Sequence, residues 1–340
     1  GVLLIILSVS CSSNSNDIDD SETENPESTT SVVPTKNTIN GFEFIDEFII
    51  PSQQISSEEV GGLSGIDYQN GKWYIISDTS TPPIRFYEAN IEYYENEFTN
   101  VDIHTMTEIK NVSGGSFSQG VVDPEAIRFD PVTQNLLYTS EGSIDANVDP
   151  ALIEINNGGT EIQKFTLPDN LKATTTDNTT GPRHNGVLEG LSLAVDGKGY
   201  WVSLELPLLE DGLEPIVTDT QSPVRVTFIS KTSKVAERQF AYELDPVARE
   251  PAFGTSFTIN GLVEVLEYDT NKFLALERSF SSGYIDGGNT VKIYKVDATE
   301  ATNTITKETL NDTDYIPATK TLLFNFETIR GKLTANTVDN

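Results

Sequence analysis

A hairpin pattern that recurs four times constrains the fold of this 340-residue chain more than any other feature. Each copy has a short apolar strand, a turn and a second apolar strand. Two of the turns, at Asn70-Gly71 and Asp196-Gly197, have the residue types that favour tight hairpins. The four copies cover residues 63–78, 124–141, 188–205 and 263–277.

The spacing of the hairpins indicates a repeat of supersecondary units. Equivalent positions at the start of the four first strands are 61, 64 and 75 residues apart: Ser64, Glu125, Glu189 and Glu264. Two further strand-like runs follow each hairpin, and four antiparallel strands form one blade of a β-propeller. Helical periodicity is absent after residue 41. We therefore expect an all-β protein, a β-propeller of four-stranded antiparallel blades with four visible repeats and five or six blades in the intact protein.

The N-terminus predicts export. Residues 1–10 form an apolar run of signal-peptide length directly before Cys11. This resembles a bacterial lipoprotein signal, in which Cys11 is lipidated, and the alternative is a buried free cysteine after an ordinary export signal. We expect a signal peptide over 1–11 that lacks its true start, an acidic disordered tether over 12–40 and the propeller domain over 41–340. The protein would then be exported and lipid-anchored to the outer membrane or cell surface.

The composition excludes several classes of function. The chain has 52 Asp and Glu against 22 Lys and Arg, a net charge of −30, which argues against nucleic acid and anionic lipid as partners. One Cys and two His exclude a disulfide framework and make a histidine-rich zinc site improbable. We expect a monomer that takes a small-molecule or phosphorylated substrate and reaches the membrane only through its lipid anchor.

The hairpins also predict an acidic rim. In an antiparallel pair the start of the first strand lies beside the end of the second. Seven carboxylates are therefore expected at one end of the central channel: Asp78, Glu125, Glu141, Glu189, Glu205, Glu264 and Glu277. Such carboxylates raise one another's pKa unless a cation compensates, and an all-oxygen donor set suits Ca²⁺. The alternative is that each acid hydrogen-bonds neighbouring backbone amides.

The same hairpins resemble those of the Phytase-like family of secreted proteins, also described as having esterase-like activity of phytase. The resemblance rests on the motifs at residues 62–67, 73–78, 84–87, 123–130, 140–142, 181–185, 188–191 and 276–280. The name of this family borrows from the propeller phytases, which look like six-bladed propellers whose acidic channel binds calcium ions that in turn hold phosphate. Family members usually carry a further blade motif where this chain stops at Asn340, so the resemblance implies that the C-terminal blade is missing.

The first functional hypothesis is a phytase-like hydrolase acting on phosphate monoesters, with the rim acids as calcium ligands. The proposed catalytic residues are Glu125, Glu189, Arg183 and His184. Phosphate would be bound by arginines that follow or flank the rim motifs, namely Arg85, Arg183 and Arg278. His184 is the candidate for protonating the leaving group.

Two other hypotheses stay open. A carboxylesterase would need an exposed nucleophile, but Ser192 lies in a loose G-x-S-x-A match inside an expected strand, and Ser64 has no evident base. A non-catalytic binding propeller on the cell surface would use rim aromatics for its ligand, for which the candidates are Trp73, Trp201, Tyr87 and Tyr284. The sequence leaves open whether the protein is an enzyme and which substrate it takes.

Overall fold

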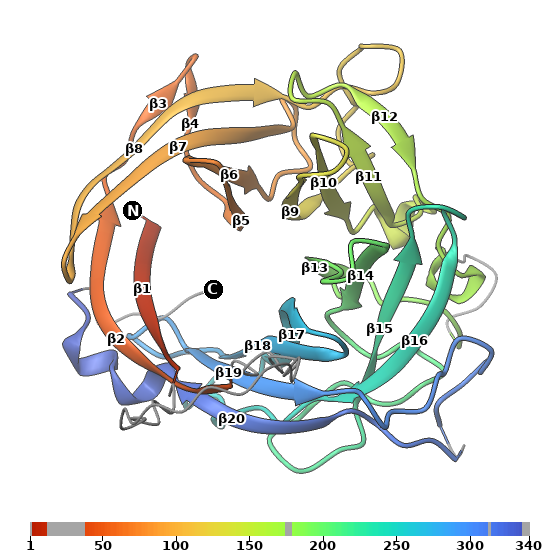
Figure 1. The fold of residues 1–340 in the computed structure, drawn as a ribbon. Coiled ribbons are helices and arrows are strands. Elements are labelled where there is room, and N and C mark those ends of the chain that lie inside the picture. Colours follow the sequence, from red (N-terminus) through yellow and green to blue (C-terminus); the bar gives the residue numbers. More distant parts are fainter. Residues whose placement is uncertain (1, 12–37, 174–178, 312–313, 335–340) are drawn as a thin grey trace, which may run out of the picture.

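Four four-stranded antiparallel sheets stand around a common axis in the computed structural model of the protein (Figure 1). The structure describes residues 2–11, 38–173, 179–311 and 314–334. Within these residues the only helices are four short 3₁₀ turns, at Ile144–Ala146, Asp169–Leu171, Phe326–Thr328 and Arg330–Lys332. None of the helices in the described part is long and apolar enough to cross a membrane. The expected all-β propeller is confirmed.

Each blade takes its strands in chain order, from the axis outward. Blade one consists of β5 (Leu63–Gln69), β6 (Lys72–Ser77), β7 (Arg85–Tyr94) and β8 (Glu97–Glu108). Blade two consists of β9 (Pro124–Asp130), β10 (Asn135–Ser140), β11 (Ala151–Ile155) and β12 (Glu161–Lys164). Blade three consists of β13 (Leu188–Leu193), β14 (Gly199–Leu204), β15 (Pro223–Ser230) and β16 (Ala236–Glu243). Blade four consists of β17 (Thr258–Asp269), β18 (Lys272–Ser281), β19 (Asn289–Asp297) and β20 (Thr319–Asn325).

The blades pack face to face, so their central strands are buried on both sides. Every residue of β9 and of β15 is buried, including the charged Arg128 and Asp130 on β9 and Arg225 on β15. Trp201 on β14 is 2% exposed and lies between the rings of Phe228, Phe240 and Phe273, with ring centroids 5.2–5.5 Å away. Apolar contact between neighbouring sheets therefore holds the blades together.

Glycines allow the inner strands to approach one another near the axis. A Cβ on Gly65 of β5 would lie 2.7 Å from the carbonyl oxygen of Glu125 in the next blade. A Cβ on Gly190 of β13 would lie 2.9 Å from the backbone nitrogen of Val265 in blade four. Because any larger residue would meet backbone at these places, glycine sets the narrow spacing at the centre of the ring.

A two-stranded sheet lies between blade four and blade one (Figure 1). It pairs β1 (Val2–Cys11) with β2 (Ile39–Ile50) in antiparallel register. β2 also contacts β8 of blade one and β20 of blade four. At the blade-one end, the backbone N–H of Phe98 donates to Asp46 at 2.8 Å, and Phe98 packs edge-on against Phe48. β2 thus connects the first and last blades, and a small hairpin of β3 (Gln54–Ile55) and β4 (Glu58–Glu59) follows it.

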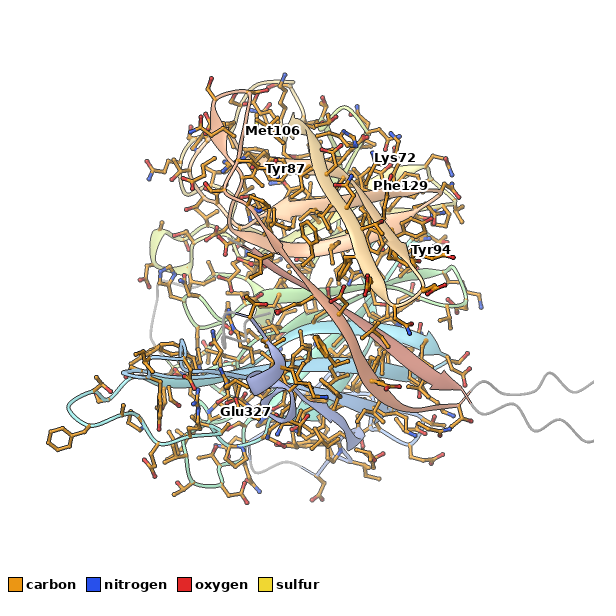
Figure 2. The ribbon with its side chains drawn as sticks, turned by 90° about the vertical axis from the view of Figure 1, so that its left-hand side faces the viewer. Lys72, Tyr87, Tyr94, Met106, Phe129 and Glu327 are labelled. Carbon is orange, nitrogen blue, oxygen red and sulfur yellow. The ribbon has the colours of Figure 1, made fainter. Side chains whose placement is uncertain are left out.

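Closure of a propeller predicts that Gly41–Ile50 either pairs with late chain, for instance Thr321–Phe326, or lies ready for a further blade. The pairing with Thr321–Phe326 is wrong. That late segment pairs within blade four, as β20 against β19, and β2 pairs with β1. Figure 2 shows the side on which β1 and β2 cross the molecule, with Tyr87 and Phe129 in the half above and Glu327 in the half below. Of the expected tether over residues 12–40, residues 12–37 lie outside the described residues, whereas Ile39 and Asn40 belong to β2. The chain end at Asn340 also lies outside the described residues.

Candidate metal centre and active site

A polar cavity of about 540 Å³ opens at the end of the channel where the first strand of each hairpin starts. Six carboxylates, one arginine, two amides and three apolar side chains line it. They are Asp78, Asp123, Glu125, Glu141, Glu189, Glu205, Arg278, Asn185, Asn289, Phe257, Ile259 and Phe280. We call it the rim cavity.

Backbone pairing places the acids of the first three blades at this rim. The N–H of Asp78 donates to the carbonyl of Gly62 at 2.6 Å, and the N–H of Glu141 donates to that of Asp123 at 2.9 Å. Glu205 makes the equivalent bond in blade three at 2.7 Å. Each of these acids therefore comes directly after the second strand of its hairpin, beside the start of the first. The structure brings these expected rim acids together with Glu125 and Glu189.

The fourth hairpin is shifted by one residue from the expected alignment. In blade three, Leu204 is the last residue of the second strand and Glu205 follows it. In blade four, Glu277 takes the paired position opposite Leu262, so Arg278 is the residue that corresponds to Glu205. Arginine thus stands where the other three blades carry an acid.

The shift turns Glu277 away from the rim, because successive side chains in a strand point to opposite faces. Glu277 is 1% exposed and accepts hydrogen bonds from Tyr242 Oη at 2.6 Å and Asn260 Nδ2 at 2.8 Å. Lys320 Nζ is 2.5 Å from its carboxylate. The prediction that Glu277 joins the rim acids is wrong: its carboxylate is already satisfied by these partners.

Glu264 also lies outside the rim cavity. Its carboxylate accepts from Arg128 Nη2 at 2.5 Å and from the backbone N–H of Leu191 at 3.0 Å. Arg128 donates in addition to the carbonyl of Ile66 at 3.0 Å. The expected convergence of Glu264 with the rim acids is therefore wrong: this pair joins the inner strands of all four blades.

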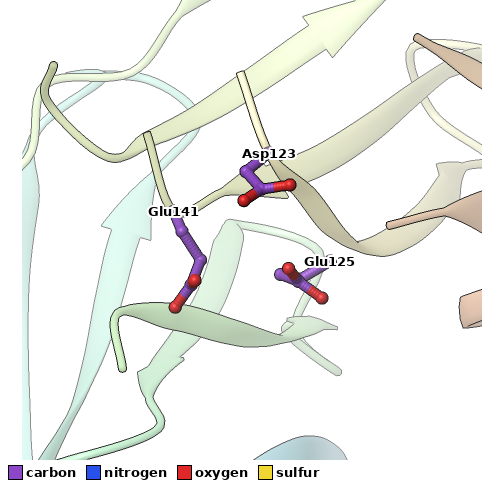
Figure 3. Close-up of side chains that lie close together, drawn as sticks. All are labelled: Asp123, Glu125 and Glu141. Atoms are coloured by element: carbon purple, nitrogen blue, oxygen red, sulfur yellow. The ribbon is translucent and has the colours of Figure 1, made fainter. Parts of the chain in front are cut away.

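Two overlapping triads of carboxylates occupy the cavity. The first is Asp123, Glu125 and Glu141, shown in Figure 3. The second is Glu141, Glu189 and Glu205, so Glu141 belongs to both. Within each triad, one oxygen from every carboxylate lies within 4.8 Å of the others. Because Ca²⁺ binds oxygens at about 2.3–2.6 Å, two ligands of one ion lie at most about 5 Å apart, and each triad fits that span.

Burial and mutual repulsion raise the pKa values of the central acids. Burial raises the pKa of Glu125 well above its ordinary value, and the charges of Glu141 and Asp78 raise it further. Burial likewise raises the pKa of Glu189, to which the charges of Glu125 and Glu205 add. Charge in this part of the cavity is therefore incompletely neutralised by the protein itself.

Two further acids have pKa values near neutrality. Burial raises the pKa of Glu205 to about 7, although the positive charge of Arg278 lowers it. Burial raises the pKa of Asp123 to about 6, with a further increase from Asp78 and a decrease from His184. These groups can therefore hold or release a proton around neutral pH.

Hydrogen bonding does not satisfy the second triad. In the part of the chain that the structure describes, no group donates a hydrogen bond to the carboxylates of Glu189 or Glu205. Arg278 Nη2 lies 3.9 Å from Glu205, and Glu141 accepts from the backbone N–H of Val187 at 2.6 Å. Because Glu205 is 5% exposed, an ionised carboxylate there is costly unless a cation compensates its charge.

The three predicted phosphate-binding arginines are separated. Only Arg278 lines the rim cavity. Arg85 donates to Tyr87 Oη at 2.6 Å and to neighbouring carbonyls. Arg183 is 3.0 Å from Glu214 and donates to two loop carbonyls, and it lines a different hollow.

His184 lies at the edge of the cavity. Its side chain is 48% exposed, and Nε2 is 3.9 Å from Asp145 Oδ2. The next residue, Asn185, lines the cavity, and the charge of His184 lowers the pKa values of Asp123 and Glu141. The imidazole is thus close enough to the first triad to act on it electrostatically.

The two candidate serine nucleophiles differ in their surroundings. Ser192 is fully buried, donates to the carbonyl of Leu193 at 3.0 Å and accepts from the N–H of Glu267 at 2.8 Å, which confirms that it is a blade residue. Ser64 donates to Glu125 Oε2 at 2.9 Å. Ser64 therefore supports the first triad at its edge.

Several cavity residues were not singled out from the sequence. In the sequence, Asp123 was only part of the motif around Glu125. Its position two residues before Glu125 is the signal that could have indicated it as a cavity residue. The aromatic residues of the cavity are Phe257 and Phe280. The four expected rim aromatics, Trp73, Trp201, Tyr87 and Tyr284, do not line it.

Comparison with known proteins gives one family and distant structural matches. No curated protein matches the chain. Among solved structures, the Dos1 propeller matches with 6% identity and a TM-score of 0.35, covering 83% of this chain and 66% of that one. Hydrazine synthase of Kuenenia stuttgartiensis matches with 12% identity and a TM-score of 0.32, covering 73% and 67%. The α-L-arabinofuranosidase PaAbf62A of Podospora anserina, solved with cellotriose, matches with 10% identity and a TM-score of 0.34, covering 73% and 68%.

This chain spans about two thirds of the length of these solved structures. A sequence model of the Phytase-like family, described as "Esterase-like activity of phytase", matches residues 58–340, which include all four blades and the rim cavity. The chain therefore belongs to the Phytase-like family.

Proposed function

We propose that this protein is a hydrolase of phosphate monoesters that works with divalent cations, most suitably Ca²⁺, held by the two carboxylate triads of the rim cavity. The family and the propeller support a hydrolase-like protein. The alternative is a non-catalytic propeller that binds its ligand in the same cavity.

The arrangement around Glu141 is the observation that carries the proposal. One carboxylate shared by two triads is the arrangement expected of two neighbouring cation sites. Glu189 and Glu205 receive no hydrogen bond in the described part of the chain, and the pKa values of both are raised by burial. A bound cation would remove this electrostatic cost, and an all-oxygen donor set selects hard ions such as Ca²⁺.

In this proposal Asp123, Glu125 and Glu141 hold one cation, and Glu141, Glu189 and Glu205 hold the other. When bound, the cations would polarise a phosphate oxygen and lower the pKa of a water molecule. Hydrolysis forms a bond from the water oxygen to phosphorus and breaks the bond from phosphorus to the ester oxygen, which takes up a proton.

The remaining polar residues would orient the substrate and move protons. Arg278 lines the cavity and would donate charge-assisted hydrogen bonds to phosphate oxygens. Asp78, which lines the cavity but belongs to neither triad, would accept the proton of the attacking water. His184 at the cavity edge would protonate the leaving oxygen, as expected from the sequence. Arg85 and Arg183 have no part in this scheme because they lie outside the cavity.

We also propose that the protein is exported and anchored through a lipid on Cys11, as a monomer. The support is the apolar segment before that cysteine and the acidic segment after it. Labelling of expressing cells with a clickable fatty acid tests this proposal. Label should depend on Cys11, and a Cys11→Ala variant that stays labelled would contradict it.

The test of the proposed activity compares three substrates with the purified protein: p-nitrophenyl phosphate, phytate and p-nitrophenyl acetate, each with Ca²⁺ or with EDTA. We expect phosphate release that needs Ca²⁺ and is lost in Glu141→Gln. The matched control, Glu92→Gln, removes one charge from an exposed position on β7 and should leave the rate unchanged. Cleavage of acetate alone, or phosphate release that survives EDTA and Glu141→Gln, would contradict the proposal.

A further inference from the structure

One wall of the rim cavity is apolar, and it comes from blade four. Phe257 precedes β17, Ile259 lies on β17, and Phe280 lies on β18 directly opposite Ile259. The rings of Phe257 and Phe280 are 5.9 Å apart between centroids, at an interplanar angle of 48°. We call these three residues the aromatic shelf.

The shelf is open at the surface beside a site built almost wholly from charged groups. The side chain of Phe257 is 61% exposed, although Phe280 and Ile259 beside it are half-buried. A flat apolar group lying against the shelf would remove this surface from water, and aromatic rings favour such offset or tilted contacts.

The charge of the cavity limits how many phosphates a substrate can carry. Six carboxylates and one arginine line it. Two divalent cations and Arg278 together would supply five positive charges against six negative ones. Little positive charge then remains for a polyphosphorylated substrate, whereas one phosphate can ligate the cations directly.

We propose that the preferred substrate is an aryl monophosphate, with its phosphate at the carboxylate triads and its aromatic leaving group on the aromatic shelf. This rests on the proposed function for the position of the phosphate and goes beyond it in the class of leaving group. Phe257 and Phe280 are then specificity-determining residues, which contact the leaving group and take no part in the reaction at phosphorus.

Binding of two non-hydrolysable phosphonates tests the shelf separately from catalysis. Isothermal titration in saturating Ca²⁺ compares phenylphosphonate with methylphosphonate. We expect the wild type to bind phenylphosphonate about tenfold more tightly, a typical effect of one well-placed aromatic contact. Phe257→Ala and Phe280→Ala should bring the two affinities close together while leaving methylphosphonate binding unchanged.

Phe253→Ala is the matched control, because Phe253 lies four residues before Phe257, is fully exposed and does not line the cavity. It should keep the preference. Phe257 is mostly exposed, so its variant is expected to fold, and a melting curve for each variant checks this.

The outcomes separate the two proposals. Three results would contradict the proposed role of the aromatic shelf. They are equal affinity of the wild type for the two phosphonates, no binding of either, and a preference for phenylphosphonate that survives both shelf variants. A shelf-dependent preference without hydrolysis of any phosphate ester would support the shelf and contradict the proposed activity. Hydrolysis of p-nitrophenyl phosphate and glycerol phosphate with equal kcat/KM would support the activity and overturn the shelf.

Discussion

Replacing Glu205 by glutamine should have opposite effects on stability with and without calcium. Glu205 is buried, belongs to the second triad and lies 3.9 Å from its nearest cation, Arg278. Without metal, Glu205→Gln removes a carboxylate whose ionisation opposes folding. With Ca²⁺ present, the same change removes a ligand, so the variant should gain less from the ion than the wild type does.

The magnitude follows from the pKa of the buried group. Burial raises the pKa of Glu205 from 4.5 to about 7, despite the lowering by Arg278. Below pH 4.5 the carboxyl is protonated in both folded and unfolded chains, and its burial then does not lower the free energy of unfolding. Above about pH 7 it is ionised in both, and the folded chain carries the full cost, which for this difference in pKa is about 3 kcal/mol. Stability of the metal-free wild type therefore falls, relative to the variant, as the pH rises between these values.

Urea unfolding with EDTA at about pH 5 and about pH 8 measures this difference. We expect the two proteins to be similar at the lower pH and the variant to be more stable at the higher pH. The control is Asp102→Asn on β8, which removes the same charge from an exposed position. The repeat in saturating Ca²⁺ should place the wild type above the variant.

Two results would refute this reasoning. One is a metal-free variant that is less stable than the wild type at the higher pH, because Glu205 would then contribute favourable interactions when ionised. The other is an equal calcium-induced gain in the two proteins, because Glu205 would then not be a ligand.

Three further predictions concern the framework. Gly65→Ala should lower the free energy of unfolding, measured in urea, by about 1–3 kcal/mol, because the new Cβ meets backbone of blade two at 2.7 Å. The control Gly41→Ala has open space around the new Cβ and should lower it much less. Equal losses of stability would contradict this. Arg225→Met should lower the free energy of unfolding by about 3–5 kcal/mol, because it leaves the buried Asp211 without its partner at 2.5 Å. The double variant Arg225→Met/Asp211→Leu should recover most of this stability, and no recovery would contradict the prediction. Although burial raises the pKa of Asp245, two lysines and a tyrosine hold that pKa at about 2, so the ionised carboxylate contributes fully to stability above pH 3.8 and this contribution is lost as the pH falls toward 2. Asp245→Asn should therefore be less stable than the wild type at neutral pH, and the difference in stability should become smaller in acid. A difference that is constant with pH would contradict this.

The fold was predictable because repetition and turn chemistry are local properties. At the first hairpin turn, Asn70 and Gly71 both have positive φ angles, 52° and 85°, which is the conformation that this residue pair favours. The regular return of such hairpins was enough to identify blades. The place of β2 was not predictable in the same way, since its partners lie far away in the sequence.

The fourth rim position was mispredicted because register is weakly encoded in a strand buried on both faces. Leu262 and Val263 are both buried, so no alternation shows which of them faces the channel. The β-bulge between Leu262 and Glu264 is equivalent to the one between Leu63 and Gly65 in blade one. Val263 rather than Glu264 therefore corresponds to Ser64, and Arg278 rather than Glu277 reaches the cavity.

Other cavity residues were missed because they lie outside the repeat. Phe257 precedes β17 in a segment with no counterpart in the other hairpins, and only the folded chain shows that it faces the acids. Asp123 likewise precedes its strand. Its carboxylate meets Glu141 because the two residues flank the same hairpin and their backbones pair there.

Calcium titration of the metal-free protein, followed by calorimetry in two buffers of different ionisation enthalpy, tests the central claim most directly. Because the pKa values of Asp123 and Glu205 are raised to about 6 and about 7, binding of a cation at near-neutral pH should drive protons off the triads, and this release should decrease as the pH rises above 7. We predict saturable calcium binding with proton release in the wild type, and loss of most of both in Glu141→Gln. Absence of calcium binding at millimolar concentration, or binding that Glu141→Gln leaves intact, would contradict the account.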